Sequence, residues 1–257
     1  MVSGSVANKA QIAAVTDLNA DSANVTETVT YTKVGSLVPS SSDGNFPRVP
    51  TVVYPNDPSD ATKVTPAGVP TVPGYTAHDP EGHVLTPGSS YQPSDPTKDT
   101  TITYTADTQK GSVSYVDDTT GKTLKTDSIS GTTGSKSSYS TSGNIADYKK
   151  HGYELVTDGY PADLTFDNND TTDQNFTVHL KHQLTPVNPT DPQTPGAPIN
   201  PDEPDGPKWP ARTNYDKTVN ETVSYVDQTG HVVAKQHTDS VTVSYTHLRA
   251  HETRSNL

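Results

Sequence analysis

The residues best suited to hold a metal ion form the segment DNNDTTD at positions 167–173. It contains two amides and the three carboxylates of Asp167, Asp170 and Asp173. Hard oxygen ligands of this kind suit Ca²⁺, but the segment lacks the central glycine and closing glutamate of an EF-hand loop. We therefore interpret it as a connector built of Asx turns, with a Ca²⁺ site as the less favoured alternative. No other cofactor is predicted.

Paired carboxylates can also serve as the acid and base of a glycosidase. That chemistry needs an apolar pocket that raises one of the two pKa values, and no segment of this sequence promises such a pocket. The sequence also has no nucleophile elbow, phosphate loop or zinc-protease helix. We therefore predict that the protein is not an enzyme.

The histidines fall into two pairs that could be considered as metal ligands. His247 and His251 lie four residues apart before Glu252, a spacing that could pair ligands on a helix, but this terminal segment does not look native. His179 and His182 lie three apart in an extended segment, which places them on opposite faces of a strand. We predict that both are exposed to solvent and bind no metal.

Tyrosines are the best candidates for contact with a sugar, because a ring can stack on a pyranose while its hydroxyl forms hydrogen bonds. The candidates lie in a segment that resembles one compact domain, and they are Tyr139, Tyr148, Tyr153 and Tyr160. The alternative is a structural role. With 13 Tyr, three Phe and 29% hydrophobic residues, tyrosine must also build the core.

Composition excludes several other classes of partner. The net charge of −12 leaves no basic face for nucleic acid or for an anionic membrane surface. The chain has no cysteine, so neither disulfide nor thiolate chemistry is available. No apolar run is long enough to cross a membrane, and the opening MVSGSVANKA is not a signal peptide. If the protein is exported, its signal and anchor are expected outside this fragment.

The segment 108–183 carries the clearest pattern of a folded module. The strand candidates GSVSYVD and KTLKTDSIS are joined by DTTG, in which Gly121 can adopt a positive φ. A short helix follows, with Asn144 as its N-cap and Gly152 at its end. The alternating segment QNFTVHLKH predicts a last strand. We expect a mostly β, α+β domain of the β-grasp type, with one helix across a small sheet.

The flanking regions are expected to be less compact. Residues 34–107 are rich in Pro, Ser and Thr, and we predict a connecting region with short strands. In residues 184–210 proline recurs at every third position from Pro186 to Pro210, which is the repeat of a polyproline II helix. We predict a stiff, extended spacer there. VTETVTYT at 25–32 and VNETVSY at 219–225 share one strand pattern.

The sequences VSYVDDTTGKTLKTDSISG, GYELVTDGYPADLTFDNND and TDQNFTVHLKH resemble the mucin-binding repeats (Mub and MucBP domains) of lactobacillus cell-surface proteins. The resemblance marks 1–33 as the end of a preceding repeat and 211–244 as the truncated start of the next. Residues 245–257 depart from the pattern and look like a non-native read-through tail. The family implies a secreted, wall-anchored extracellular adhesin that binds mucus glycoproteins and, in some members, immunoglobulins.

Two alternatives to mucus binding remain open from the sequence. The fragment could be a passive stalk that presents a distant domain, since a spacer and small repeated modules also suit that role. It could also be an immunoglobulin-binding module. The family has no single-residue motif that would carry a binding site onto this chain.

Overall fold

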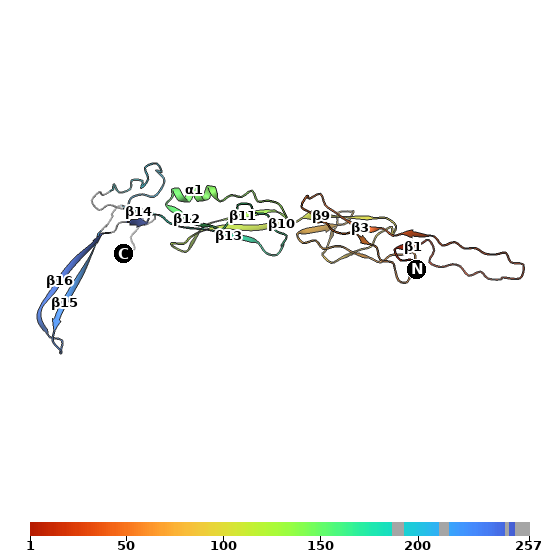
Figure 1. Cartoon of the computed structure of the whole chain (residues 1–257), viewed down its shortest axis with the longest axis horizontal. Coiled ribbons are helices and arrows are strands. Elements are labelled where there is room, and N and C mark those ends of the chain that lie inside the picture. The colour runs from red at the N-terminus through yellow and green to blue at the C-terminus, as the bar shows by residue number, and fades with distance from the viewer. Residues whose placement is uncertain (187–192, 211–215, 245–246, 250–257) are drawn as a thin grey trace. The chain divides into compact units, whose positions relative to one another are not determined.

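The computed structural model describes residues 1–186, 193–210, 216–244 and 247–249 (Figure 1). The chain is mostly β, with one short helix within these ranges. It divides into two compact units. The first comprises residues 1–111, 129–137 and 163–174, and the second comprises 112–128, 138–162 and the described part of 175–257. The predicted fold class is confirmed.

The first unit is built on a five-stranded sheet with the order β4-β3-β9-β6-β7. Its strands are β3 (Ser36–Ser40), β4 (Val52–Val53), β6 (Tyr75–His78), β7 (Val84–Leu85) and β9 (Thr100–Ala106). Two smaller sheets pair β1 (Ser5–Ala7) with β2 (Tyr31–Lys33) and β5 (Ala67–Gly68) with β8 (Ser90–Tyr91). Of the strand predicted over 25–32, only its end falls in β2.

Residues 34–107 are therefore folded as part of the first unit. The predicted short strands are present, but the region is not merely a connection. Ile102 and Tyr104 of β9 are almost fully buried and pack with Leu37 and Tyr54 in one core. The prolines do not prevent this, because they lie mainly between short strands. Pro39 is inside β3, but β4 pairs only with residues 36 and 37, so the missing amide breaks no bond to β4.

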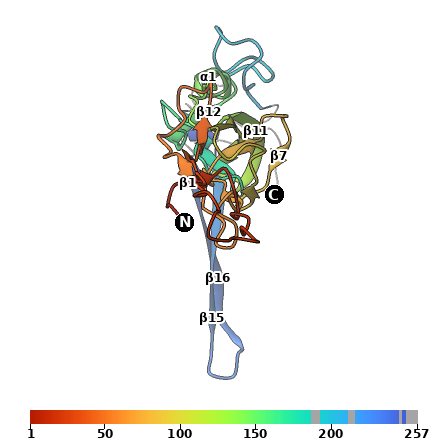
Figure 2. The same ribbon diagram turned by 90° about the vertical axis from the view of Figure 1, so that its right-hand side faces the viewer.

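A four-stranded sheet, most of whose residues belong to the second unit, has the order β11-β10-β13-β12. Its strands are β10 (Thr108–Asp117), β11 (Lys122–Thr132), β12 (Tyr153–Asp158) and β13 (Gln174–His182). Helix α1 (Ser142–Lys150) lies along one face of these strands in both views (Figures 1 and 2). Alternation buries Val113 and Tyr115 in β10, and Val178 and Leu180 in β13, with no exposed surface.

Helix α1 ends as predicted but begins differently. Gly152 has φ of +90°, the left-handed conformation that closes a helix and favours glycine. The N-cap is Thr141 and not Asn144, and the cap side chain forms no bond to the helix backbone. Its hydroxyl instead donates to Asp158 at 2.5 Å. Asn144 lies inside the first turn, where its side chain is free to point toward the sheet.

Near the C-terminus, β14 (Leu184–Pro186) pairs with β17 (His247–Arg249), so three residues of the predicted non-native tail join a strand pair. The strands β15 (Asp216–Val226) and β16 (Val232–Ser244) form a long hairpin (Figure 2). Gly230, with φ of +88°, lies in its turn. The predicted strand at 219–225 is confirmed within β15.

Residues 193–210 do not form the extended spacer that the proline repeat predicts. The Gly196 amide donates to Trp209 O at 2.8 Å, and the Trp209 amide donates to Ala197 O at 2.9 Å. A polyproline II helix has no internal hydrogen bonds, so the prediction is wrong for this stretch. Proline also suits tight turns, and Gly196 has φ of +80°, which lets the chain reverse. Residues 187–192 of the predicted spacer lie outside the described part.

Candidate ligand-binding site

The structure brings the four candidate tyrosines together in the second unit, as two groups of contacting rings. In the first group, the Tyr148 ring of α1 lies 5.6 Å from that of Tyr115 and 5.5 Å from that of Tyr153. The Tyr153 ring in turn lies 5.4 Å from the imidazole of His182. Tyr148 and Tyr153 are half-buried, so each keeps part of its ring surface accessible.

The second group has less accessible rings. The Tyr160 ring meets those of Tyr139 and Phe176 edge-on, at 5.3 and 5.5 Å. Tyr160 is 9% exposed, and these two neighbours pack against it. Tyr160 is therefore part of the core, whereas Tyr139 is half-buried and its hydroxyl joins a polar network.

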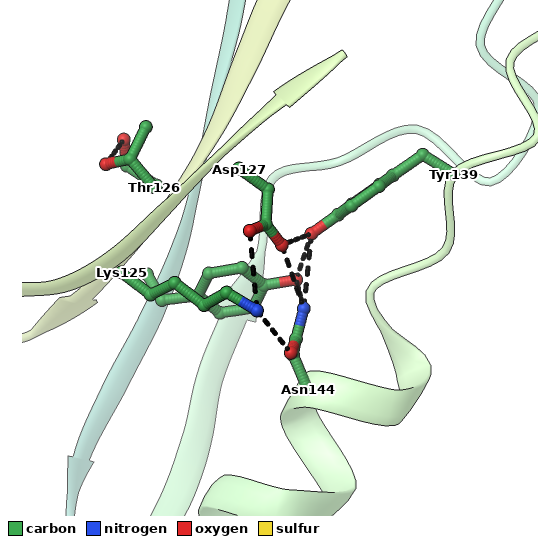
Figure 3. Close-up of polar contacts among 7 residues, drawn as sticks. Lys125, Thr126, Asp127, Tyr139 and Asn144 are labelled. Carbon is green, nitrogen blue, oxygen red and sulfur yellow. Dashed lines mark hydrogen bonds and ion pairs between the residues drawn. The ribbon is translucent and has the colours of Figure 1, made fainter.

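Asn144 is the centre of that network (Figure 3). Its amide nitrogen lies 3.1 Å from both the Tyr115 hydroxyl and the Asp127 carboxylate. Its carbonyl oxygen accepts a hydrogen bond from the Lys125 ammonium at 3.1 Å. Tyr139 donates to Asp127 at 2.8 Å, so in the 2.6 Å contact between the two hydroxyls Tyr115 must be the donor. Each group therefore donates to the next, from the Asn144 amide through the two tyrosine hydroxyls to the Asp127 carboxylate.

The same bonds fix the charges of the network. Burial alone would raise the pKa of Asp127, but hydrogen bonds from Tyr139, Lys125 and Asn144 outweigh it and lower that pKa. Burial, with the bonds to Tyr115 and Asp127, raises the pKa of Tyr139. At neutral pH, Asp127 is a carboxylate and Tyr139 a neutral donor. The Tyr139 hydroxyl is thus already engaged within the protein.

A groove of about 440 Å³ lies at one end of the four-stranded sheet, beside the β10–β11 turn, the start of β12 and the end of β13. Its lining residues are Asp118, Thr119, Glu154, Lys181, His182 and Leu184. Glu154 and Lys181 form an exposed ion pair at 2.7 Å across neighbouring strands. The groove therefore offers hydroxyl, carboxylate, ammonium and imidazole groups side by side. We call it the end groove.

His182 is held in this groove by a buried partner. Its Nε2 lies 2.9 Å from the Asp117 carboxylate, and the two side chains are 11% and 2% exposed. Burial would raise the pKa of Asp117, but bonds from Thr120 and the Thr119 amide, together with His182, lower it. The carboxylate is thus kept ionised, and it orients the His182 ring toward Tyr153.

Comparison with known proteins gives a family for this module. Residues 109–182 match the family model described as a mucin binding domain. The type 2 repeat of the mucus binding protein MUB from Lactobacillus reuteri is 34% identical, over 55% of this chain and 69% of that one, with a TM-score of 0.35. The chain belongs to the mucin-binding repeat family. We call residues 109–182 the mucin-binding module.

A second solved structure, Mub-RV, is also 34% identical to the chain, and the match covers 52% of this chain and 60% of that one. Its TM-score is 0.31, so the assignment to the mucin-binding repeats depends on the family match and on sequence identity, not on superposition. A comparison with curated proteins gave no match. Among the described residues, no helix has the length and apolarity needed to span a membrane.

The histidines of the mucin-binding module differ in part from prediction. His179 is 41% exposed and contacts the Asp118 carboxylate at 2.8 Å. His182 is largely buried against Asp117, so the expected solvent exposure is wrong for that residue. The reason is that Asp117 ends the central strand β10 and turns its carboxylate inward. For the C-terminal pair, His251 and Glu252 lie outside the described residues, and the side chain of His247 is not described.

The acidic segment adopts the turns that its composition favours. Asp167 accepts the Asn169 amide at 3.1 Å, and Asn169 accepts the Thr171 amide at 3.1 Å, both as Asx turns. Asp170 accepts a bond from Gln109 at 2.6 Å, and Asp173 is exposed. The carboxylates of Asp167, Asp170 and Asp173 do not lie close enough together to form a three-ligand group among the described residues. A Ca²⁺ site there stays a prediction.

The described residues contain one three-residue group close enough to hold a metal ion, formed by Asp79, Glu81 and His83 in the first unit. Sequence reasoning did not select it, and it also missed Lys125, Asp127 and Asp117. A signal was present for Asp117 alone, since an aspartate that ends a strand before a turn such as DTTG commonly accepts the amide two residues later.

Proposed function

We propose that the chain is a non-catalytic segment of a bacterial cell-surface adhesin, acting outside the cell, that binds the glycans of mucus glycoproteins. The observation that carries the proposal is the extent of the family match, compared with the elements that form the groove. The residues that match the mucin binding domain, 109–182, contain nearly all of the four-stranded sheet, the whole helix, and every lining residue of the end groove except Leu184.

The end groove supplies the chemistry that a sugar ring requires. Glu154 and Asp118 can accept bonds from sugar hydroxyls, and Lys181 can donate to ring or carboxylate oxygens. His182 is fixed by Asp117, so its imidazole meets a ligand without first losing rotamer freedom. The half-buried ring of Tyr153, adjacent to His182, stays our candidate for stacking.

The groove is suited to binding and not to glycoside hydrolysis. A glycosidase needs one carboxyl group whose pKa is raised so that it can donate a proton. The buried carboxyl group beside the groove, Asp117, has a lowered pKa. Burial and the nearby Asp170 do raise the pKa of Asp107 in the first unit, but neither of these two residues lines the end groove.

The proposal is tested by measuring retention of the whole chain on immobilised mucin and on the same mucin after deglycosylation. We expect retention on intact mucin only. The double variant Glu154→Gln, Lys181→Met should lower it about tenfold, a loss of roughly 1.4 kcal/mol, because both groups of the groove pair lose their charge. Lys110→Met, at an exposed position of β10, is the matched control and should leave retention unchanged.

Equal, background retention on both surfaces would favour the passive stalk, in which the module only carries a distant domain. Retention that survives deglycosylation would instead indicate recognition of the mucin polypeptide. Immunoglobulins, the other expected partner, receive no support from the family match or from the two similar repeats.

A further inference from the structure

The first unit contains a groove larger than the end groove. Its volume is about 740 Å³, and all of its lining residues belong to that unit. The floor is the outer face of β9. Because side chains alternate along a strand, Thr101, Thr103 and Thr105 point outward while Ile102 and Tyr104 enter the core. The three hydroxyl groups follow one another at about 7 Å, the two-residue repeat of a strand.

One wall of this groove is a well-ordered turn after β6. Asp79 accepts the His83 amide at 2.8 Å and contacts its Nδ1 at 3.0 Å, and Gly82, with φ of +87°, closes the turn. Only 12% of the Asp79 side chain is exposed. On the neighbouring strand, His78 pairs with Thr103 and holds the turn against the floor. The wall is therefore preorganised, which limits the entropy lost on binding.

Tyr91 adds an aromatic surface beside these carboxylates. It lies in β8, is partly buried and lines the groove. Burial raises the pKa of its hydroxyl, and the charges of Glu81 and Asp79 raise it further. The hydroxyl therefore stays neutral and lies within electrostatic reach of both carboxylates. A ring of this kind can stack on the C–H face of a sugar while its hydroxyl forms a hydrogen bond.

The charge of the lining selects the ligand. Three carboxylates, those of Asp79, Glu81 and Asp99, line the groove, and among its described lining residues none is Lys or Arg. An acidic sugar would meet uncompensated negative charge, which costs free energy. A neutral sugar has many hydroxyl donors for carboxylates, and the row of threonines can both donate to it and accept from it. A cationic peptide would use the carboxylates but not the threonine row.

We propose that this groove is a second carbohydrate site, which binds neutral hexose-containing glycan ends that carry neither sialic acid nor sulfate. The site is formed by residues outside the mucin-binding module. The ligand class follows from the lining of the groove alone, so the inference extends the proposed function without depending on the end groove.

The test uses the whole chain and two albumin conjugates, one carrying N-acetyllactosamine and one carrying its sialylated form. We expect the neutral conjugate to bind at least tenfold more tightly. Thr103→Val removes a floor hydroxyl and keeps a residue that favours strands, and Glu81→Gln removes a wall charge. Each should weaken binding of the neutral conjugate at least fivefold. Thr32→Val, at an exposed position of β2, is the matched control and should have no effect.

Equal binding of the two conjugates, or wild-type affinity in both groove variants, would overturn the proposal. So would tight binding of hexalysine together with no response to the neutral conjugate. The variant Glu154→Gln, Lys181→Met separates this site from the end groove. If that variant loses retention on mucin but still binds the neutral conjugate, the two sites are independent. If the wild-type chain is retained on mucin but does not bind the neutral conjugate, the proposal for this groove is refuted. The proposal for the end groove then still stands.

Discussion

Asn144 shows how one amide can organise several hydroxyl and charged groups. It joins α1 to Tyr115, Tyr139 and Asp127, and Tyr115 is fully buried. Replacing Asn144 with Ala leaves the Tyr115 hydroxyl and one carboxylate oxygen with fewer partners. We expect the free energy of unfolding to fall by about 1–3 kcal/mol, the usual cost of an unsatisfied buried polar group. Urea titration of the whole chain measures it.

Lys125→Met is the control for this substitution. Lys125 is 45% exposed and contacts the same network from the solvent side, so its loss should cost less than about 1 kcal/mol. If both variants lose the same free energy of unfolding, Lys125 contributes as much to the network as Asn144 does. The central role of Asn144 is then refuted.

The buried carboxylate of Asp117 should make the stability of the folded protein sensitive to acid. Because the pKa of its carboxyl group is lowered in the folded protein, its contribution to stability is complete above the ordinary value of 3.8. That contribution is lost as the pH falls through the lowered pKa, below about pH 4. In Asp117→Asn we expect stability at pH 7 to fall by roughly 2 kcal/mol, because hydrogen bonds to a charged group are lost.

Urea midpoints between pH 2 and 7 measure this effect. The Asp117→Asn variant should show a flatter pH profile below pH 4 than the wild type. Asp118→Asn, whose carboxylate is 39% exposed, is the control and should cost less stability at pH 7 than Asp117→Asn. Parallel profiles for wild type and Asp117→Asn would contradict the assignment.

At the scale of elements, the sequence was most informative where one strand is long enough to show its own alternation. The strand predicted from QNFTVHLKH coincides with β13, and the glycines at 121 and 152 have the expected positive φ. The fold of residues 34–107 was missed because β3 pairs with β9, about 60 positions later in the chain. Apart from β9, whose buried and exposed residues alternate over Thr100–Ala106, each strand is too short for its alternation to stand out among the prolines. Pairing between strands so far apart in the sequence leaves no pattern in either strand alone.

The candidate site could also be predicted only in part from the sequence. Tyrosine type and abundance pointed to residues whose rings contact one another in the structure, but their partners could not be identified, and their role in ligand binding stays a prediction. Asn144 was assigned to a cap because an asparagine before a helical pattern usually caps it. Its actual role depends on Asp127 and Tyr115, which are brought to it only when the sheet forms.

Gly35 offers a test that residues 34–107 form the folded sheet. A Cβ at this position would clash with the backbone oxygen of Lys98. Gly35→Ala should therefore push these segments apart and lower the free energy of unfolding by about 1–3 kcal/mol. Gly44→Ala is the matched control, because a Cβ there meets no atom within 4 Å. Equal thermal stability of the two variants would contradict the sheet.

At the scale of the whole molecule, each unit has its own core and its own groove. Weak sites that are linked in one chain raise avidity without any new contact, since the second binding event becomes intramolecular. The net charge of −12 fits ligands that are held by hydrogen bonds and ring contacts. Repetition of such units is thus a physical route to firm attachment from individually weak sugar contacts.

The reversal at residues 196–209 contains Trp209, the single tryptophan of a chain with 13 tyrosines. Emission excited at long wavelength therefore comes from that turn alone, whereas tyrosine emission comes from residues spread over both units. One unlabelled sample followed at two excitation wavelengths can thus separate the opening of the proline-rich turn from the melting of the sheets.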